Sequence, residues 1–267
     1  MNIKLIRAAI LKNIFSIRFL IVLIISFILT YIELHTTNKW DVLGKENFLL
    51  YTIVFDGIGR GTGLYLASLP LLASLVGGTL YGQEFRSRRN IFHLARLSKK
   101  EYLLSLSIAG FILGGISVIT PLLINGLTAW FRLPYFSQNL GQFTIYEKTF
   151  FAYSFAVKHP ILIILLVIFI FFVYGGLFSL LSISISYLYT NIVLEVSGIF
   201  IMSFITYLLL QVLALEHFHF YWYLNILAES TSLSIIVSLL MGFITIFIIS
   251  HWELKQDDLQ SNQEKIR

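Results

Sequence analysis

The chain has no cysteine among its 267 residues and little charge, with only 12% Asp, Glu, Lys and Arg. The first absence excludes disulfides, thiolate zinc sites and cysteine nucleophiles. The second excludes an ordinary soluble domain, in which about 25% of residues are charged. Hydrophobic residues make up 57% of the chain and aromatic residues 16%. A surface of this composition has to face lipid, so the sequence predicts an integral membrane protein.

Long uncharged runs predict six membrane-spanning helices, since a helix needs about 20 mostly apolar residues to cross the hydrocarbon layer. The predicted spans are residues 13–32, 61–83, 104–130, 160–183, 191–213 and 230–250. The fourth and fifth are separated where Tyr, Ser, Thr and Asn replace aliphatic residues at 184–191. The predicted fold is therefore an all-α integral membrane protein with a single transmembrane domain over residues 1–267.

Lys and Arg are distributed unequally between the segments that connect these spans. Four, six and three of them lie in residues 1–18, 84–101 and 251–267, against three, three and none in 33–60, 132–158 and 216–229. Because cytoplasmic segments carry the excess of Lys and Arg, we expect both chain ends on the cytoplasmic side of a cell membrane, a bacterial plasma membrane. No basic arm remains that would favour nucleic-acid binding.

The N-terminal segment carries two further signals. Residues 1–12 alternate basic with apolar side chains, which predicts an amphipathic helix lying in the headgroup layer. The apolar run after it ends in Glu33, Leu34 and His35 instead of the small residues of a cleavage site. We therefore expect a retained first span and not a signal peptide.

Motifs for nucleotide or metal chemistry are incomplete. Residues 56–63 alternate glycine with other residues, but they lack the Gly-Lys-Ser/Thr of a Walker loop and the third glycine of the dinucleotide fingerprint. Glu216, His217 and His219 could ligate a metal, but the two histidines would face opposite ways on a helix, and the aromatic neighbours favour an interfacial belt. Intramembrane protease motifs are absent from the sequence. We expect no enzyme activity, and no metal or cofactor bound by this chain.

Two features inside the predicted spans have alternative interpretations. Glu195 is the one acidic residue in a predicted span, near the start of 191–213. Either the N–H groups of the helix N-terminus stabilise its carboxylate, or it forms an intramembrane pair with Arg18, which is predicted at a similar depth. Gly110 and Gly114 form a Gly-x-x-x-Gly motif, which suits helix packing within one chain or between two copies.

The segment between the second and third spans carries the strongest functional signal. In residues 84–97 apolar side chains repeat at helical spacing and arginines occupy much of the remainder, which predicts a short amphipathic helix on the cytoplasmic face. Such a segment is either a positively charged loop that touches lipid phosphates or a docking helix for a soluble partner.

This order of features resembles the membrane subunits of ABC-2-type transporters. Those subunits commonly have a Glu at the end of the second span, a short helix with leucines, and a Ser-Arg/Lys-x-x-Tyr-Leu segment at the start of the third span. Glu84, residues 91–97 and residues 98–104 follow the same order. The chain departs from the pattern at Arg88-Arg89, where many members have Gly-Thr, and at Ser105-Leu106, where many have a Lys.

The resemblance implies a permease subunit that forms half of a transport path with a second copy or a similar permease. Two separate ATP-binding cassette subunits would bind ATP and Mg²⁺, and each would receive one loop helix. The residues expected to dock on the ATPase are Glu84, Phe85, Arg88, Ile91, Phe92, Leu94 and Ala95. The family mostly exports, and spans with so little charge suit a hydrophobic or amphipathic peptide, lipid or drug. The alternatives are a six-span secondary transporter or channel without an ATPase, or a peptide-binding membrane immunity protein.

Overall fold

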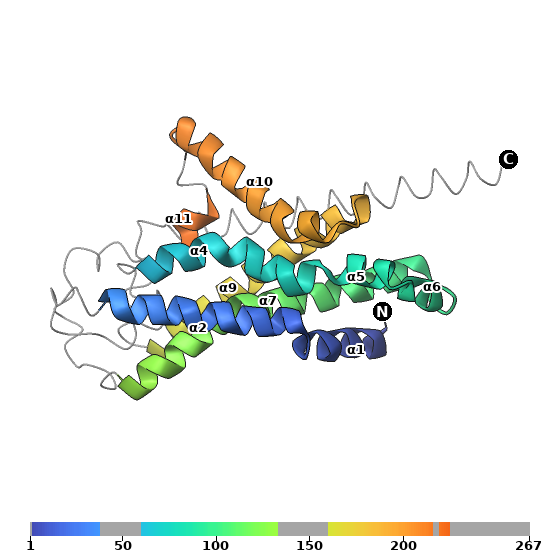
Figure 1. Ribbon diagram of the computed structural model, residues 1–267, viewed down its shortest axis with the longest axis horizontal. Helices are drawn as coiled ribbons and strands as arrows, with labels where there is room; N and C mark the ends of the chain where they lie inside the picture. The colour runs from blue at the N-terminus through green and yellow to red at the C-terminus, as the bar shows by residue number, and fades with distance from the viewer. Residues whose placement is uncertain (1, 38–59, 133–159, 216–218, 225–267) are drawn as a thin grey trace.

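The computed structural model describes residues 2–37, 60–132, 160–215 and 219–224, which form helices with no strand among them (Figure 1). Four helical segments in this part of the chain are long and apolar enough to cross a membrane, or five if one bent pair counts as a span. The prediction of an all-α, membrane-embedded protein is therefore confirmed. The predicted sixth span at 230–250 and the tail at 251–267 lie outside the described residues.

The N-terminal segment folds into α1 (Ile3–Ile14) and α2 (Ile17–Thr37). Asn2 caps α1 by accepting a hydrogen bond from the Leu5 N–H at 3.2 Å. The two helices meet at an angle of 54°. Residues 1–12, predicted to be amphipathic, thus become a helix of their own, which packs beside α7. The predicted first span ends too early, because α2 continues past residue 32 and buries Glu33 in its last turns.

The second span is divided into α4 (Arg60–Ala73), a π-helical turn η1 (Ser74–Gly78) and α5 (Leu80–Arg86). Pro70 lies in α4, where its ring removes one backbone N–H from the helix ladder. The π turn brings Gly77 against the backbone of α7 and a serine of α9, where a Cβ would meet the Gly110 carbonyl and the Ser179 hydroxyl. Glycine is needed here because two neighbouring helices approach closely.

Two long helices, α7 (Lys99–Arg132) and α9 (Pro160–Leu188), pack against each other along the centre of the molecule (Figure 1). Gly110 of α7 accepts a hydrogen bond from the Ser179 hydroxyl of α9 at 2.8 Å. Gly114 lies against the Gly175 carbonyl of α9. The Gly-x-x-x-Gly motif of the predicted third span therefore packs within one chain.

The division between the fourth and fifth spans is shorter than the sequence indicates. Helix α9 continues to Leu188 and α10 (Ile192–Val212) begins immediately after Asn191, which caps it by accepting from the Val193 N–H at 2.9 Å. Residues 184–188 stay helical, and the Ser186 hydroxyl there donates to the Ile183 carbonyl at 2.8 Å. The predicted span 191–213 agrees with α10.

Helix α10 diverges from the other helices toward its C-terminal end, and the short α11 (Phe220–Leu224) returns to α4 (Figure 1). Most large apolar side chains of α10 are exposed, among them Val193, Ile201, Met202, Phe204, Ile205, Leu209 and Val212. In a membrane such a surface contacts lipid. On its other side α10 places Ile199 in the core and Tyr207 against His219, just before α11.

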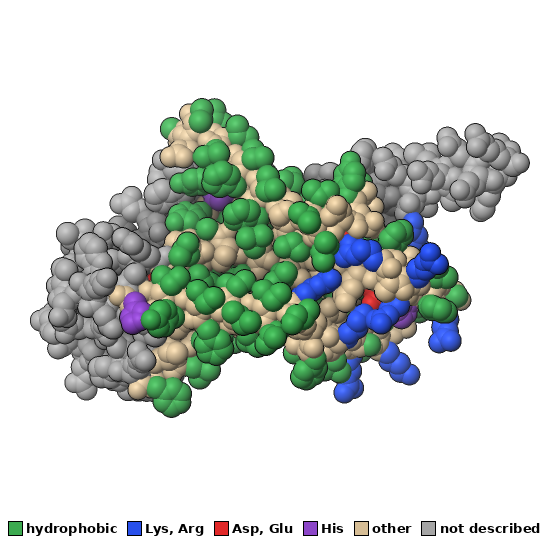
Figure 2. All heavy atoms as spheres, in the orientation of Figure 1, with side chains coloured by type: hydrophobic (Ala, Val, Ile, Leu, Met, Phe, Trp, Pro, Cys, Tyr) green, Lys and Arg blue, Asp and Glu red, His purple; other side chains and the backbone are tan. Residues whose placement is uncertain are grey.

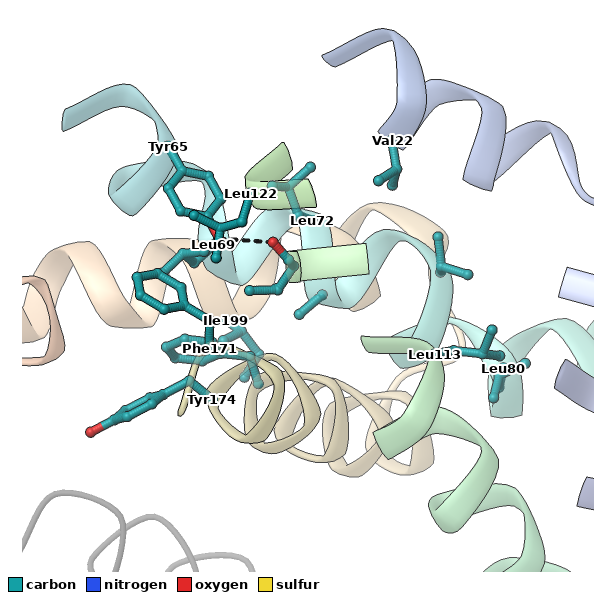
Figure 3. Packing of buried hydrophobic residues seen from close by; sticks show 14 of the residues in the cluster. Val22, Tyr65, Leu69, Leu72, Leu80, Leu113, Leu122, Phe171, Tyr174 and Ile199 are labelled. Atoms are coloured by element: carbon teal, nitrogen blue, oxygen red, sulfur yellow. Dashed lines mark hydrogen bonds between the residues drawn. The ribbon is translucent and has the colours of Figure 1, made fainter. Parts of the chain in front are cut away.

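The core lies between α4, α7 and α9 (Figure 3). The Tyr65 hydroxyl of α4 donates to the Val118 carbonyl of α7 at 2.8 Å, and its ring stacks on Phe171 of α9 at 5.6 Å. Leu69 lies beside this contact, whereas Leu113 lies farther along α7 near Leu80, and both leucines are fully buried (Figure 3). These three helices form the fixed frame on which α5 and α10 are placed.

Candidate functional site

Basic side chains gather at one end of the molecule, over α1, α5, α6 and the first turn of α7, whereas hydrophobic side chains cover the visible flank of the helices (Figure 2). We call this region the basic end. It contains the segment 84–101 that the sequence analysis singled out, together with two carboxylates, Glu84 and Glu195, that form ion pairs. The candidate site is built from this segment and these carboxylates.

The predicted helix over residues 84–97 is broken in the structure. Glu84 and Phe85 belong to α5, and Arg88 adopts a left-handed conformation with φ 56° before α6 (Arg89–Leu94) begins. Helix α5 ends where the Ser87 hydroxyl bonds back to the Gln83 carbonyl at 2.8 Å. The prediction of one continuous helix was wrong in its boundaries, and Ala95 lies at the C-cap of α6.

Helix α6 leaves its apolar side chains uncovered by the described residues. Ile91 is 61% exposed, Phe92 74% and Leu94 40%. With Phe85 of α5, which is also exposed, these residues form what we call the α6 patch. Arg88, Arg89 and Arg96 are exposed beside it. Apolar side chains at a strongly charged end of a molecule are typical of an interaction surface.

Glu84 is engaged within the chain. Its carboxylate accepts from Lys12 Nζ of α1 at 2.8 Å, and it lies 4.0 Å from Arg89 Nη1 and 3.8 Å from His93 Nε2 of α6. The His93 ring in turn stacks on Tyr102 of α7, with ring centroids 5.7 Å apart. Glu84 was predicted to be a docking residue, but its place in the structure is at the junction of α1, α5 and α6, where it holds α6 in position.

Glu195 forms a bidentate ion pair with Arg86, and not with Arg18 as the sequence suggested. Arg86 Nη1 and Nη2 lie 2.5 Å and 2.9 Å from the two carboxylate oxygens. Arg86 Nη1 also donates to the Thr190 carbonyl in the α9–α10 turn at 2.9 Å. Arg18 instead donates to Thr79 Oγ1 at 2.6 Å. The pair with Arg18, one of the two interpretations of Glu195, is therefore not formed, and both carboxylate oxygens are bonded to Arg86 at the end of α5.

The two side chains of this ion pair are buried to different extents. The Glu195 side chain is completely buried, whereas the Arg86 side chain is 33% exposed. Gly82 lies directly against the carboxylate, and a Cβ at that position would collide with it. Gly82 and Arg86 are four residues apart and so share one face of α5. A glycine one turn before an arginine was the signal of close approach that the sequence analysis missed.

Glu195 also lies in the first turn of α10, as the helix-terminus interpretation requires. The two interpretations are compatible, because unpaired N–H groups favour a carboxylate there while Arg86 supplies the counter-charge. The Ser182 hydroxyl of α9 donates to the Glu195 carbonyl. The start of α10 is thus bound to both α5 and α9.

The predicted aromatic belt is only partly within the described residues, since Glu216 and His217 are not. His219 is buried beside the rings of Tyr207 and Phe220, and its Nε2 lies 3.2 Å from the Ser203 carbonyl. Burial lowers the pKa of His219 to about 4, so this imidazole is neutral at pH 7. Among the described residues no group of three or more His, Asp or Glu side chains could hold a metal ion.

No protein-family model, no curated protein and no solved structure matches the chain. What can be said of its function rests on the arrangement at the basic end. There Arg88 lies in sequence between Arg86, which is paired with the buried Glu195, and α6. A force applied to α6 would therefore reach the first turn of α10 through only a few residues.

Proposed function

We propose that the chain is the permease subunit of an ABC-2-type ATP-binding cassette transporter. It would have six spans and cytoplasmic ends in the plasma membrane, and it would pair with a second copy or a similar permease. Two separate ATPase subunits would hydrolyse ATP with Mg²⁺ and drive export of a hydrophobic or amphipathic peptide, lipid or drug. The observation that carries the proposal is the exposed α6 patch at the basic end, between the two spans where the resemblance places the docking helix.

The chemistry of the α6 patch suits a groove on a soluble protein. Short helices dock by placing a few apolar side chains into a hydrophobic groove. Burying Phe92 alone would contribute roughly 1.5–3 kcal/mol. The exposed arginines around it would meet acidic side chains at the rim of the groove, where they speed association more than they tighten binding.

The Arg86–Glu195 pair supports a mechanism for this transporter. Helix α6 follows Arg86 by only a short connection, and Arg86 is bound to Glu195 and to the Thr190 carbonyl. Most large apolar side chains of α10 are exposed, and its other contacts include those of Ile199 with the core and of Tyr207 with His219 and Tyr221. Movement of α6 on a closing ATPase would therefore pull the start of α10, and it would tilt α10 against the fixed frame of α4, α7 and α9.

The buried polar groups favour this reading over a secondary transporter. Ion-coupled transporters place ionisable side chains near the middle of their spans. In the described spans the charged residues lie in the first or last turns of their helices, among them Arg18, Glu33, Glu84, Arg86 and Glu195. The polar groups farther along are hydroxyls and an amide, such as Ser74, Ser117 and Asn125. Because these groups carry no charge, they favour apolar cargo over ions.

Purification of the tagged chain from its native membrane tests the proposal. We expect an ATP-binding cassette subunit to co-purify, and the reconstituted complex to hydrolyse ATP faster than the ATPase alone. Purification without an ATPase, combined with transport driven by an ion gradient, would establish the secondary-transporter alternative. Protection against a peptide without either partner or transport would establish the immunity-protein alternative.

A further inference from the structure

Arg18 has an incompletely satisfied guanidinium at the edge of the apolar part of the molecule. It is the second residue of α2, and its Nη1 donates to Thr79 Oγ1 at 2.6 Å and to Gln83 Oε1 at 3.5 Å. Both acceptors are neutral. Its Nε and Nη2 groups, which carry the other N–H donors, bond to no acceptor among the described residues. The guanidinium therefore has donors available for a further ligand.

The neighbouring carboxylate of Glu195 is not the acceptor for these donors of Arg18. Glu195 lies near enough to interact with the charge of Arg18, but both of its oxygens are bonded to Arg86. Arg86 also acts on Arg18 as a like charge. This corner of the bundle thus holds two guanidinium groups and one carboxylate. A partly desolvated cation without its own anion is costly, so an additional anion would be stabilising here.

The residues near Arg18 in sequence indicate which kind of anion could bind there. Arg18 is partly exposed, and Phe15, Ile17, Leu20 and Ile21, which are its neighbours in sequence, have exposed apolar side chains. Farther along α2 the exposed side chains remain apolar, as at Ile24 and Ile28. A ligand that fits both the Arg18 guanidinium and the apolar surface of α2 has an anionic head at the basic end and hydrocarbon chains along α2. The guanidinium fork matches the geometry of phosphate oxygens.

We propose that Arg18, held in place by Thr79 and Gln83, binds the phosphate of a phospholipid headgroup whose acyl chains lie along α2. Arg18 approaches from α2, whereas Thr79 and Gln83 belong to the second span. The bound lipid would therefore stabilise the contact between these two spans. The site does not depend on the transport function proposed above.

Lipid binding to the purified full chain in detergent tests this site. Phosphatidylglycerol should be retained in native mass spectrometry and should raise the midpoint of thermal unfolding. Diacylglycerol with the same chains, and inorganic phosphate alone, should do neither. Arg18→Gln should weaken phosphatidylglycerol binding about tenfold, because a charge-assisted, bidentate contact is lost. The control Arg7→Gln changes an exposed arginine of α1 and should alter binding less than about twofold.

Arg18→Lys keeps the positive charge but lacks the planar guanidinium that can bond two phosphate oxygens at once. It replaces Arg18→Gln as the test variant if Arg18→Gln does not fold. It should bind the lipid several-fold more weakly than the native chain. Native-strength binding by Arg18→Lys would overturn the proposal. If inorganic phosphate raised the unfolding midpoint as much as phosphatidylglycerol does, the site would bind a free anion. If diacylglycerol raised it as much, only contact with the acyl chains would remain. An equal loss in Arg7→Gln would show diffuse attraction to a basic surface. Each of these results overturns the assigned site.

Discussion

Arg86 and Glu195 join the last residue of α5 to the first turn of α10 through two short contacts, at 2.5 Å and 2.9 Å. The carboxylate is completely buried, and the guanidinium reaches partly to solvent. The guanidinium of the pair therefore lies near the surface, and the carboxylate lies inside the helix bundle. Its position before α6 makes it the main link between the α6 patch and α10.

Removing the arginine from this pair should destabilise the protein more than neutralising the acid. Arg86→Ala leaves a buried carboxylate without a counter-ion, and breaking such a pair costs about 3–5 kcal/mol. Glu195→Gln leaves Arg86 able to reach water, so its cost should be smaller. Denaturant unfolding in detergent measures both variants, with the exposed Arg96→Ala as the control. An Arg86→Ala protein as stable as Arg96→Ala would show that the pair contributes little.

Gly82 should not accept a side chain. A Cβ there would collide with the Glu195 carboxylate, so Gly82→Ala should displace the acid and cost roughly 1–3 kcal/mol. Gly63 of α4 is the matched control, because a Cβ there would meet only the Tyr221 hydroxyl, at 3.3 Å. Gly63→Ala should cost less than Gly82→Ala, because only the far end of the Tyr221 side chain has to move, and by a few tenths of an ångström. Equal unfolding midpoints for the two alanine variants would contradict the close approach at Gly82.

The sequence predicted those parts of the fold that depend on local composition. The span 191–213 agrees with α10 nearly to the residue, because Asn191 caps the helix and the apolar run ends where the helix does. The amphipathic character of α6 was also recognisable, since Ile91, Phe92 and Leu94 lie in a segment where apolar residues repeat at helical spacing among arginines. Local patterns carry this information without knowledge of the neighbouring helices.

Pairings between distant segments could not be predicted in the same way. Arg18 and Arg86 are both plausible partners for Glu195, and the choice depends on how α5 lies against the α9–α10 turn. The break at Arg88 has no Gly or Pro to mark it, since a serine hydroxyl ends α5 and an arginine adopts the left-handed conformation. The periodicity of apolar residues predicts neither the partner of Glu195 nor the break at Arg88.

Acidification should weaken the attachment of His219. Its pKa is about 4 in the folded protein against about 6.5 in an unfolded chain, so the unfolded state binds the proton more readily. This contribution to stability is full above about pH 6.5 and is lost as the pH falls toward 4. His219→Phe keeps a ring beside Tyr207 and should reduce the fall in unfolding midpoint between pH 7.5 and 5. The exposed His35→Gln should leave that fall unchanged.

The orientation in the membrane can be tested directly because the native chain has no cysteine. The excess of Lys and Arg predicts that residue 96 faces the cytoplasm. Arg96→Cys should react with a membrane-impermeant maleimide only after the cells are opened, whereas a cysteine placed at residue 40 should react in intact cells. Labelling of position 96 in intact cells would reverse the proposed topology and remove α6 from reach of any cytoplasmic ATPase.

Truncation of the α6 patch should separate docking from folding. Phe92 is 74% exposed, so Phe92→Ala should leave the unfolding midpoint nearly unchanged. If the side chain enters a groove on an ATPase, its loss removes roughly 1.5–3 kcal/mol and weakens association by about one to two orders of magnitude. Co-purification and stimulated ATP hydrolysis measure the effect. The control is Phe15→Ala, which removes an equally large and even more exposed ring, 85% exposed, between α1 and α2.

Leu94→Ala should act in the same direction as Phe92→Ala, whereas Arg88→Ala should change association by less than about 1 kcal/mol, because exposed ion pairs contribute little. This ordering distinguishes a helix seated in a groove from a loop held by charge alone. A surface that binds only through its arginines would show the reverse ordering, with Arg88→Ala more damaging than Phe92→Ala. If neither apolar truncation reduces co-purification while both proteins stay folded, α6 does not couple an ATPase to this chain, and the proposed transporter loses its principal support.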